Sequence, residues 1–430
     1  MTDIKTLIDE SPISRQQIVV IGLCLLMNML DGMDVLVISY AAPVLAEDWG
    51  IASEALGVVF SAALLGMTLG ALFLSPFADK IGRRKMILFC VLGMSLSVIL
   101  TAVTQDVWQL MILRFLSGLG IGGMLASTAT LAAEYAPERQ KNFFVSIVMS
   151  GYPIGATIAG LVAAQVIPAF GWRTMFVVAG LAGLATIPFV YFFLTESMDW
   201  LIKKQPRAAL EKLNRILRKM GLPESETLPE LREEAKKNPL VSLFEDGRTL
   251  MTIQLWVAFF LAFATLYFLT AWIPNLASDM GLAVDLAIYA GTIFNLGAVF
   301  GIWLQGLLSQ AIGLRKAIVS FMIFTAILMG TFGYLEADYL ILISLGLIGF
   351  GVQGGFIGMY AVSARVYPTE IRNTGVGGAI GAGRTGAIVS PALAGVLVGI
   401  GLTPAQNFIA FGVPLIIVCL LIGLLRSKAV

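Results

Sequence analysis

Apolar and polar positions follow one another along the chain in long blocks, with extended apolar runs separated by short polar segments. Apolar runs of about 20 residues are typical of helices that cross a bilayer, because a helix rises about 1.5 Å per residue and the hydrocarbon core is about 30 Å thick. Twelve such runs occur, at residues 17–46, 55–77, 86–104, 107–133, 142–168, 173–194, 250–276, 285–308, 317–335, 339–364, 374–400 and 404–425. The pattern predicts an all-α integral membrane protein with twelve transmembrane helices.

One long polar segment, residues 196–248, interrupts this pattern between the sixth and seventh runs. It divides the chain into an N-terminal six-helix half (1–195), the segment itself (196–248) and a C-terminal six-helix half (249–430). Its stretches "PRAALEKLNRILRKMG" (206–221) and "PELREEAKKNP" (229–239) are typical of short amphipathic surface helices. We expect a cytoplasmic linker here, with a regulatory domain as the alternative.

The basic residues predict the orientation of the helices. With an even number of crossings, all Lys and Arg except Arg114, Arg173 and Arg384 fall on the side of the two termini and the long polar segment. Basic loops face the cytoplasm. We therefore expect a multi-pass protein of the inner membrane with both termini cytoplasmic.

The two halves match each other without gaps when the sequence is shifted by 231 residues. Under this shift "YAAPVLAEDWGI" (40–51) meets "AWIPNLASDMGL" (271–282), "IGRRK" (81–85) meets "IGLRK" (312–316), and "GLGIGG" (118–123) meets "GFGVQG" (349–354). The match predicts two parallel six-helix repeats. Transporters built from such repeats hold the substrate between the halves near the membrane midplane and rock one half against the other.

Composition narrows the class of protein further. The chain is 58% hydrophobic and 13% charged, with a net charge of +1, which offers no basic or acidic arm for a nucleic-acid partner. The three cysteines lie apart in apolar runs, and no nucleophile–base set, metal-ligand cluster or nucleotide loop is visible, so we expect neither an enzyme nor a cofactor. Histidine is absent, so a proton handled near neutral pH has to reside on a carboxylate.

Three buried charges, Asp31, Asp34 and Arg114, have no charged counterpart in the second half. Charges inside a membrane are costly and mark functional sites by default. Asp31 and Asp34 project from one helix face, and counting about 1.5 Å per residue places Asp31 and Arg114 at the same depth. We expect these residues to couple proton entry to an acidic substrate. A permanent Asp–Arg bridge that only fixes the first helix against the fourth is the alternative.

Arg384 lies near the midplane in the glycine-rich stretch "GGAIGAGRTGAIVSP" (377–391). Its planar guanidinium suits a carboxylate, which predicts an anion-binding role; a backbone carbonyl or an unrecognised acid is the alternative partner. Other candidate groups lining the site are polar or aromatic, each with ordinary packing as its alternative: Asn28, Tyr40, Tyr267, Trp272, Asn295, Gln353, Phe356 and Tyr360.

Several motifs resemble those of a known family. "SPFADKIGRRK" (75–85) is similar to the loop 2–3 signature of the major facilitator superfamily, although Ser75 stands where glycine is common. "DGMD" (31–34) resembles the DG-x-D motif of the aromatic acid:proton symporter family in that superfamily, and residues 367–391 and "ESMDWL" (196–201) are similar to other parts of it. The resemblance extends over essentially the whole chain.

The resemblance implies roles for individual residues. Asp79 and Arg83 would latch the cytoplasmic side through breakable charge pairs, and the second copy of the signature, with Gln310 in place of the acid, would latch more weakly. The implied gate residues are Asp79, Gly82, Arg83, Arg84, Glu134 and Arg372. The functional positions of the family also match Asp31, Asp34, Arg114 and Arg384.

These observations favour a proton-coupled symporter that imports a small aromatic or related organic acid, such as benzoate, hydroxybenzoate, protocatechuate or a muconate-like carboxylate. Its expected partners are the acid, protons and the lipid bilayer, and we expect it to function as a monomer. A proton-coupled exporter of drugs or metabolites is the alternative. A non-transporting sensor is a third hypothesis, for which the polar segment offers little sequence.

Overall fold

The computed structural model describes residues 7–9, 11–228, 241–245, 247–368 and 371–425, and in this part of the chain all regular structure is helical. Twelve helical spans are long and apolar enough to cross a membrane. Eleven are α2 (Arg15–Trp49), α5 (Arg83–Thr101), α6 (Val107–Tyr135), α7 (Lys141–Phe170), α8 (Trp172–Phe193), α11 (Thr249–Asp279), α12 (Val284–Ile312), α13 (Leu314–Thr331), α14 (Asp338–Val366), α15 (Arg372–Gly399) and α16 (Pro404–Gly423). The remaining span combines α3 (Ser53–Leu69), the π-helical turn η1 (Gly70–Leu74) and α4 (Ser75–Ile81). The twelve predicted transmembrane helices are confirmed, with ends shifted by about one turn or less.

The described part of the polar segment forms α9 (Met198–Lys204), α10 (Ala209–Met220) and the 3-10 turn η3 (Val241–Leu243). The amphipathic helix predicted over 206–221 is present as α10, which buries Leu213 and Leu217 and exposes Arg215 and Lys219. The helix predicted over 229–239 lies outside the described residues. Two further 3-10 turns, η2 (Glu138–Gln140) and η4 (Phe332–Tyr334), adjoin α7 and α13.

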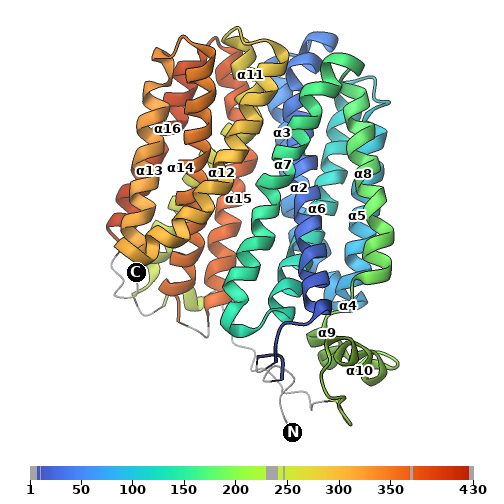
Figure 1. Ribbon diagram of the computed structural model, residues 1–430. Coiled ribbons are helices and arrows are strands. Elements are labelled where there is room, and N and C mark those ends of the chain that lie inside the picture. Colours follow the sequence, from blue (N-terminus) through green and yellow to red (C-terminus); the bar gives the residue numbers. More distant parts are fainter. Residues whose placement is uncertain (1–6, 10, 229–240, 246, 369–370, 426–430) are drawn as a thin grey trace.

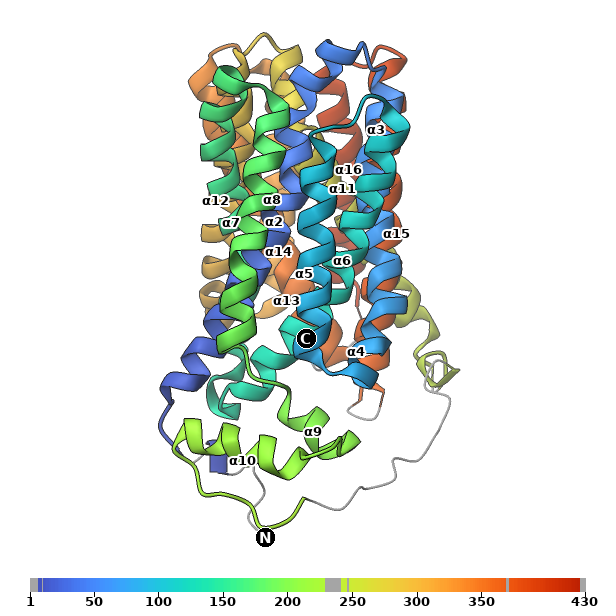
Figure 2. The ribbon, with the colours of Figure 1, turned by 90° about the vertical axis from the view of Figure 1, so that its right-hand side faces the viewer.

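The spans form two bundles that stand side by side, α2 to α8 in one and α11 to α16 in the other (Figure 1). Helices α9 and α10 lie at one end of the first bundle (Figures 1 and 2). We call this end, where α2 begins and α16 ends, the linker end, and the opposite end the far end. In both bundles the spans run from the linker end to the far end, as membrane-crossing helices must (Figure 1).

The sequence repeat is reproduced in the packing of the two bundles. Helix α3 packs against α6 in the first bundle, and α12 packs against α14 in the second. A Cβ atom on Gly66 would overlap the carbonyl oxygen of Phe115, and a Cβ on Gly297 would overlap that of Gly346. Gly297 and Gly346 are the repeat equivalents of Gly66 and Phe115, since each lies 231 residues further along the chain. The same backbone contact is therefore made once in each bundle. Glycine is required there because only a residue without a side chain permits this approach.

Hydrogen bonds join the two bundles toward the far end. Ser39 Oγ on α2 donates to the carbonyl oxygen of Ala271 on α11 at 2.7 Å. Ser61 Oγ on α3 donates to the carbonyl oxygen of Ile388 on α15, also at 2.7 Å. The bundles are therefore closed against each other on the far side of the molecule.

Candidate functional site

The motif "DGMD" lies in the middle of α2, where this helix touches α7. A Cβ on Gly32 would overlap the carbonyl oxygen of Tyr152, so the two helices meet backbone to backbone. This contact brings the Tyr152 side chain within electrostatic reach of Asp31. Gly32 therefore permits the close packing of α2 against α7 beside Asp31.

Asp34 is the partner of Arg114. Arg114 Nη1 lies 2.8 Å from Asp34 Oδ1, and both side chains are at most 4% exposed. Ser117 Oγ donates to the other carboxylate oxygen, Arg114 Nη2 donates to Thr101 Oγ1 at 3.1 Å, and the guanidinium lies 5.2 Å from the ring centre of Phe176. Asp34 and Arg114 thus form a satisfied buried ion pair that ties α2 to α6 inside one bundle.

Counting residues places Arg114 at the depth of Asp31, but its side chain pairs with Asp34, about one helical turn further along α2. Counting residues locates Cα atoms, whereas helical side chains lean toward the N-terminus of their own helix. Helix α6 begins at the far end, so the Arg114 side chain leans that way and reaches Asp34. For Asp34, the geometry favours the alternative of a structural bridge.

We expect Asp34→Asn to lower the stability of the protein by about 3–5 kcal/mol, because it leaves the buried Arg114 without its counter-ion. The double variant Asp34→Asn/Arg114→Gln should recover part of this loss, because it removes both charges. Unfolding temperatures of the purified variants in detergent provide the measurement. An Asp34→Asn variant as stable as the wild type would contradict the structural role.

Asp31 differs from Asp34 in having no hydrogen-bond or ion-pair partner among the described residues. It is 1% exposed, yet neither carboxylate oxygen accepts a hydrogen bond from the described part of the chain. Asn28 Oδ1, one turn earlier on α2, and Tyr152 Oη are buried and equally unsatisfied among the described residues. A buried carboxylate without donors is costly unless it is protonated or meets a ligand or a cation.

Arg384 is the cation that acts on Asp31 from the other bundle. It is half-buried on α15 and forms neither a hydrogen bond nor an ion pair with the described residues, so neither alternative partner considered for it is found there. Its charge acts on Asp31, Tyr152, Tyr267 and Tyr360. An acid and a guanidinium that have no partners within the described ranges thus interact electrostatically from opposite halves.

Five aromatic rings of α11 and α14 border this region, and we call them the aromatic wall. They recur at four-residue spacing within each helix and comprise Phe259, Phe263 and Tyr267 on α11 with Phe356 and Tyr360 on α14. Neighbouring ring centres are 4.7–6.2 Å apart. A Cβ on Gly383 would overlap the Phe263 ring, so the missing side chain beside Arg384 lets the wall pack against α15.

Other predicted lining residues have different surroundings. Tyr40 Oη donates to a backbone carbonyl of α7 at 2.9 Å, and Trp272 Nε1 donates to one of α15 at 3.0 Å. Asn295 Nδ2 donates to a carbonyl of its own helix at 2.8 Å. These three groups are engaged in helix packing in this conformation. Gln353 forms no hydrogen bond with the described residues and remains a candidate.

The predicted gate residues of the first bundle form one network at the linker end. Arg83 lies 2.8 Å from Glu134 and 3.8 Å from Asp79. Ser197 Oγ donates to Glu134 at 2.7 Å, and the backbone N–H of Arg83 donates to Glu196 Oε1 at 2.8 Å. The network joins α4, α5 and α6 to the start of the linker.

The remaining gate candidates are divided between the bundles. The N–H of Arg84 donates to Glu196 Oε1, and Gly82 has φ = 101° and provides the space that Glu196 occupies. Arg372 begins α15 in the other bundle and forms no ion pair with the described residues. The observed charge network therefore stays within the first bundle.

Several residues of these sites were given no role from the sequence, among them Tyr152, Phe259, Phe263 and Glu196. The spacing of Phe259, Phe263 and Tyr267 carries a usable signal, since residues four apart lie on one helix face. Tyr152 carries no signal of this kind, because its role depends on a contact between helices. Glu196 begins the family-like stretch "ESMDWL", but that resemblance assigns it no contact with α5. No group of His, Cys, Asp and Glu in the described ranges could hold a metal ion.

The chain belongs to the Major Facilitator Superfamily, whose family model matches residues 24–304 and 255–429. Together with the twelve spans and bacterial relatives, this indicates a multi-pass transporter of the inner membrane. The chain is 32% identical to the 4-hydroxybenzoate transporter PcaK of Pseudomonas aeruginosa over 96% of this chain and 93% of that protein. It is 31% identical to the gallate transporter of Pseudomonas putida over 96% and 92%.

Solved structures show the same fold. The xylose transporter XylE from E. coli superposes with a TM-score of 0.75 at 17% identity, over 96% of this chain and 98% of that one. A bacterial homologue of the human lysosomal transporter Spinster superposes with a TM-score of 0.74 at 16% identity, over 96% and 97%.

Proposed function

We propose that this transporter is a proton-coupled symporter that imports a small aromatic or related organic acid. The names of its relatives, which include transporters of 4-hydroxybenzoate, gallate and benzoate, support the substrate class. The excess of basic residues at the linker end supports a cytoplasmic position for that end, with the far end outside the cell.

One observation carries the proposal: Asp31 and Arg384 have no hydrogen-bond or ion-pair partner in the part of the chain that the structure describes, belong to different halves and lie within electrostatic reach of each other beside the aromatic wall. The guanidinium is suited to bind the carboxylate of the substrate in a bidentate manner. The rings of the wall offer apolar faces and edges to an aromatic ring. Asp31 is the group that accepts the proton.

The balance of charge gives a reason for coupling. In the empty site the negative Asp31 offsets the positive Arg384, so the pair is neutral. Binding a proton to Asp31 and a carboxylate to Arg384 leaves the site neutral again. A proton alone or an anion alone leaves one net charge, which is costly when the site closes away from water. The empty and the fully loaded transporter should therefore change conformation most readily.

The site favours a symporter over an exporter of cationic drugs. A site for a cation gains from buried acids alone, whereas Arg384 has no ion-pair partner among the described residues and acts electrostatically on Tyr267 and Tyr360. The geometry is matched to an organic anion.

Proteoliposomes test the proposed function. With an acidic exterior, they should accumulate 4-hydroxybenzoate or benzoate. Because one proton accompanies one monovalent anion, the uptake should be electroneutral and unaffected by an imposed membrane potential. The neutral analogue benzyl alcohol serves as the control and should neither compete nor accumulate. Equal uptake with and without the pH gradient would contradict proton coupling.

A further inference from the structure

Two groups beside Asp31 lack a hydrogen-bond partner within the described residues and have no role in the proposed transport cycle. Asn28 is 2% exposed, and its side-chain oxygen Oδ1 is buried without a donor. The hydroxyl oxygen of Tyr152 is buried in the same condition. A buried polar atom that forms no hydrogen bond costs free energy, and folded proteins satisfy almost all of them. Two such atoms at one place indicate that a ligand supplies the missing hydrogen bonds.

The packing of α2 against α7 brings these two groups together. A Cβ on Gly151 would lie 3.0 Å from the Cβ of Asn28, and a Cβ on Gly32 would overlap the carbonyl oxygen of Tyr152. Asn28 and Gly32 are four residues apart, so they lie on the same face of α2. Gly151 directly precedes Tyr152 on α7, so Asn28 lies beside the segment that carries the tyrosine. We call Asn28, Asp31 and Tyr152 the polar cluster.

Residues of the second bundle lie within reach of the polar cluster. Tyr152 is within electrostatic reach of Arg384 and of Tyr267 in the aromatic wall, as well as of Asp31. The polar cluster belongs to α2 and α7 of the first bundle, whereas Arg384 is on α15 and the wall is on α11 and α14 of the second. A substrate whose carboxylate binds Arg384 therefore meets the polar cluster from the opposite bundle.

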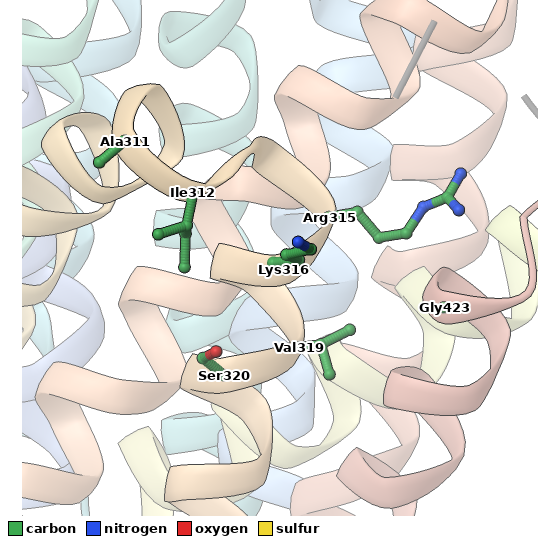
Figure 3. A pocket seen from close by; sticks show the side chains of 7 residues that line it. All are labelled: Ala311, Ile312, Arg315, Lys316, Val319, Ser320 and Gly423. Atoms are coloured by element: carbon green, nitrogen blue, oxygen red, sulfur yellow. The ribbon is translucent and has the colours of Figure 1, made fainter. Parts of the chain in front are cut away.

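A hollow at the linker end of the second bundle shows the opposite case, because its arginine is engaged by the chain itself. This hollow lies between α12, α13 and α16, with Arg315 and Lys316 among its lining residues (Figure 3). Arg315 extends toward the end of α16, and its Nη2 donates to the carbonyl oxygen of Leu425 at 2.6 Å (Figure 3). Asn28 and Tyr152 differ from it, since no group of the described chain bonds to their buried oxygens.

We propose that Asn28 and Tyr152 bind a hydroxyl group at the para position of the substrate ring and thereby select 4-hydroxylated aromatic acids. This inference rests on the proposed function, in which Arg384 binds the carboxylate of the same substrate. A hydroxyl has one proton to donate and two lone pairs to accept. It donates to Asn28 Oδ1 and accepts from the Tyr152 hydroxyl, which satisfies both groups. The para position lies across the ring from the carboxylate, as the polar cluster lies in the opposite bundle from Arg384.

The same arrangement disfavours acids that lack this hydroxyl. A methyl group at the para position is similar in size to a hydroxyl but forms no hydrogen bond, so it leaves both polar atoms unpaired. A site built to hydrogen-bond a hydroxyl rejects such an analogue more strongly than an apolar pocket does. In 2-hydroxybenzoate the hydroxyl is beside the carboxylate and bonds to it, so it does not reach the polar cluster.

Isothermal titration of the full-length protein with 4-hydroxybenzoate, 4-methylbenzoate, 2-hydroxybenzoate and benzoate tests this selection. The wild type should bind 4-hydroxybenzoate about tenfold more tightly than the other three acids. Asn28→Leu keeps the branched shape of the side chain and removes its hydrogen bonds. It should weaken the binding of 4-hydroxybenzoate about tenfold without weakening that of the other three. Tyr152→Phe should weaken the binding of the same acid alone, by about threefold.

Tyr367→Phe is the matched control. It removes the hydroxyl of another buried tyrosine, which bonds to Thr252 Oγ1 at 3.3 Å at the linker end of the second bundle. This variant should bind all four acids as the wild type does. Unfolding temperatures in detergent show which variants are folded, and the four affinities of the wild type test the selection without any variant.

Two results would overturn the proposal. Equal affinities of the wild type for 4-hydroxybenzoate and 4-methylbenzoate would show that no group of the protein binds the hydroxyl. Equal losses for all four acids in folded Asn28→Leu and Tyr152→Phe would show that these side chains support Asp31 or the packing of α2 instead. Either result leaves carboxylate binding and proton coupling intact, whereas a failure to bind any of the four acids would refute the proposed function itself.

Discussion

Replacing Arg384 by alanine should weaken the binding of an aromatic carboxylate by about 100-fold, because the substrate then enters the site without a cationic partner. Arg384 is half-buried and forms no ion pair with the described residues. Asp31 is the carboxylate on which its charge acts, so its removal should cost little stability elsewhere. Stability should therefore change far less than affinity. Isothermal titration of the purified variant with 4-hydroxybenzoate measures the effect.

Two further variants separate the role of the guanidinium from that of charge in general. Arg384→Lys keeps the charge but loses the planar fork, and it should bind about tenfold more weakly than the wild type. Arg365→Ala removes an exposed arginine near the end of α14 and should leave affinity unchanged. Wild-type affinity in folded Arg384→Ala would remove Arg384 from the binding site.

Asp31→Asn should abolish accumulation driven by a pH gradient and spare the exchange of labelled for unlabelled substrate. Asparagine is neutral, as a protonated Asp31 would be, so the variant resembles the loaded carrier and can still move substrate in both directions. It cannot release a proton, so it cannot return empty in a neutral form. Uptake and counterflow in proteoliposomes, measured on the same preparation, distinguish these steps.

The matched control is Asp338→Asn, which removes an exposed acid at the start of α14 and should leave both activities intact. Normal accumulation by Asp31→Asn would exclude Asp31 as the proton carrier. Loss of exchange together with accumulation in a folded variant would indicate that Asp31 binds substrate rather than coupling it to protons.

The fold could be predicted from the sequence because the bilayer restricts what a spanning segment can be. Apolar runs such as 107–133 and 404–425 correspond closely to α6 and α16. The repeat could also be predicted from the sequence, because equivalent positions of the two halves meet the same packing requirement. Gly66 and Gly297, for example, make the same close backbone contact. The π-helical turn of η1 and the short helix α9 were not predicted, because neither changes the hydrophobic pattern.

The candidate site could be predicted only in part. Asp31, Asp34, Arg114 and Arg384 were identifiable because charges inside a membrane are rare. Their pairing was not, since the depth of a Cα atom does not locate the end of a long side chain such as that of Arg114. Of the aromatic wall, Tyr267, Phe356 and Tyr360 were candidates from the sequence. Phe259 and Phe263 were not, because aromatic residues are common in membrane helices and only packing between α11 and α14 sets Phe263 apart.

Proton uptake on substrate binding tests the central claim most directly. The purified transporter is mixed with 4-hydroxybenzoate in weakly buffered detergent solution over a range of pH, and the protons taken up per bound anion are counted with a pH-sensitive dye. At pH values where the free protein is unprotonated at Asp31, the wild type should take up close to one proton per anion, and Asp31→Asn should take up none. Binding by the wild type without proton uptake at every pH, or equal uptake by Asp31→Asn, would contradict the exchange of partners between Asp31 and Arg384.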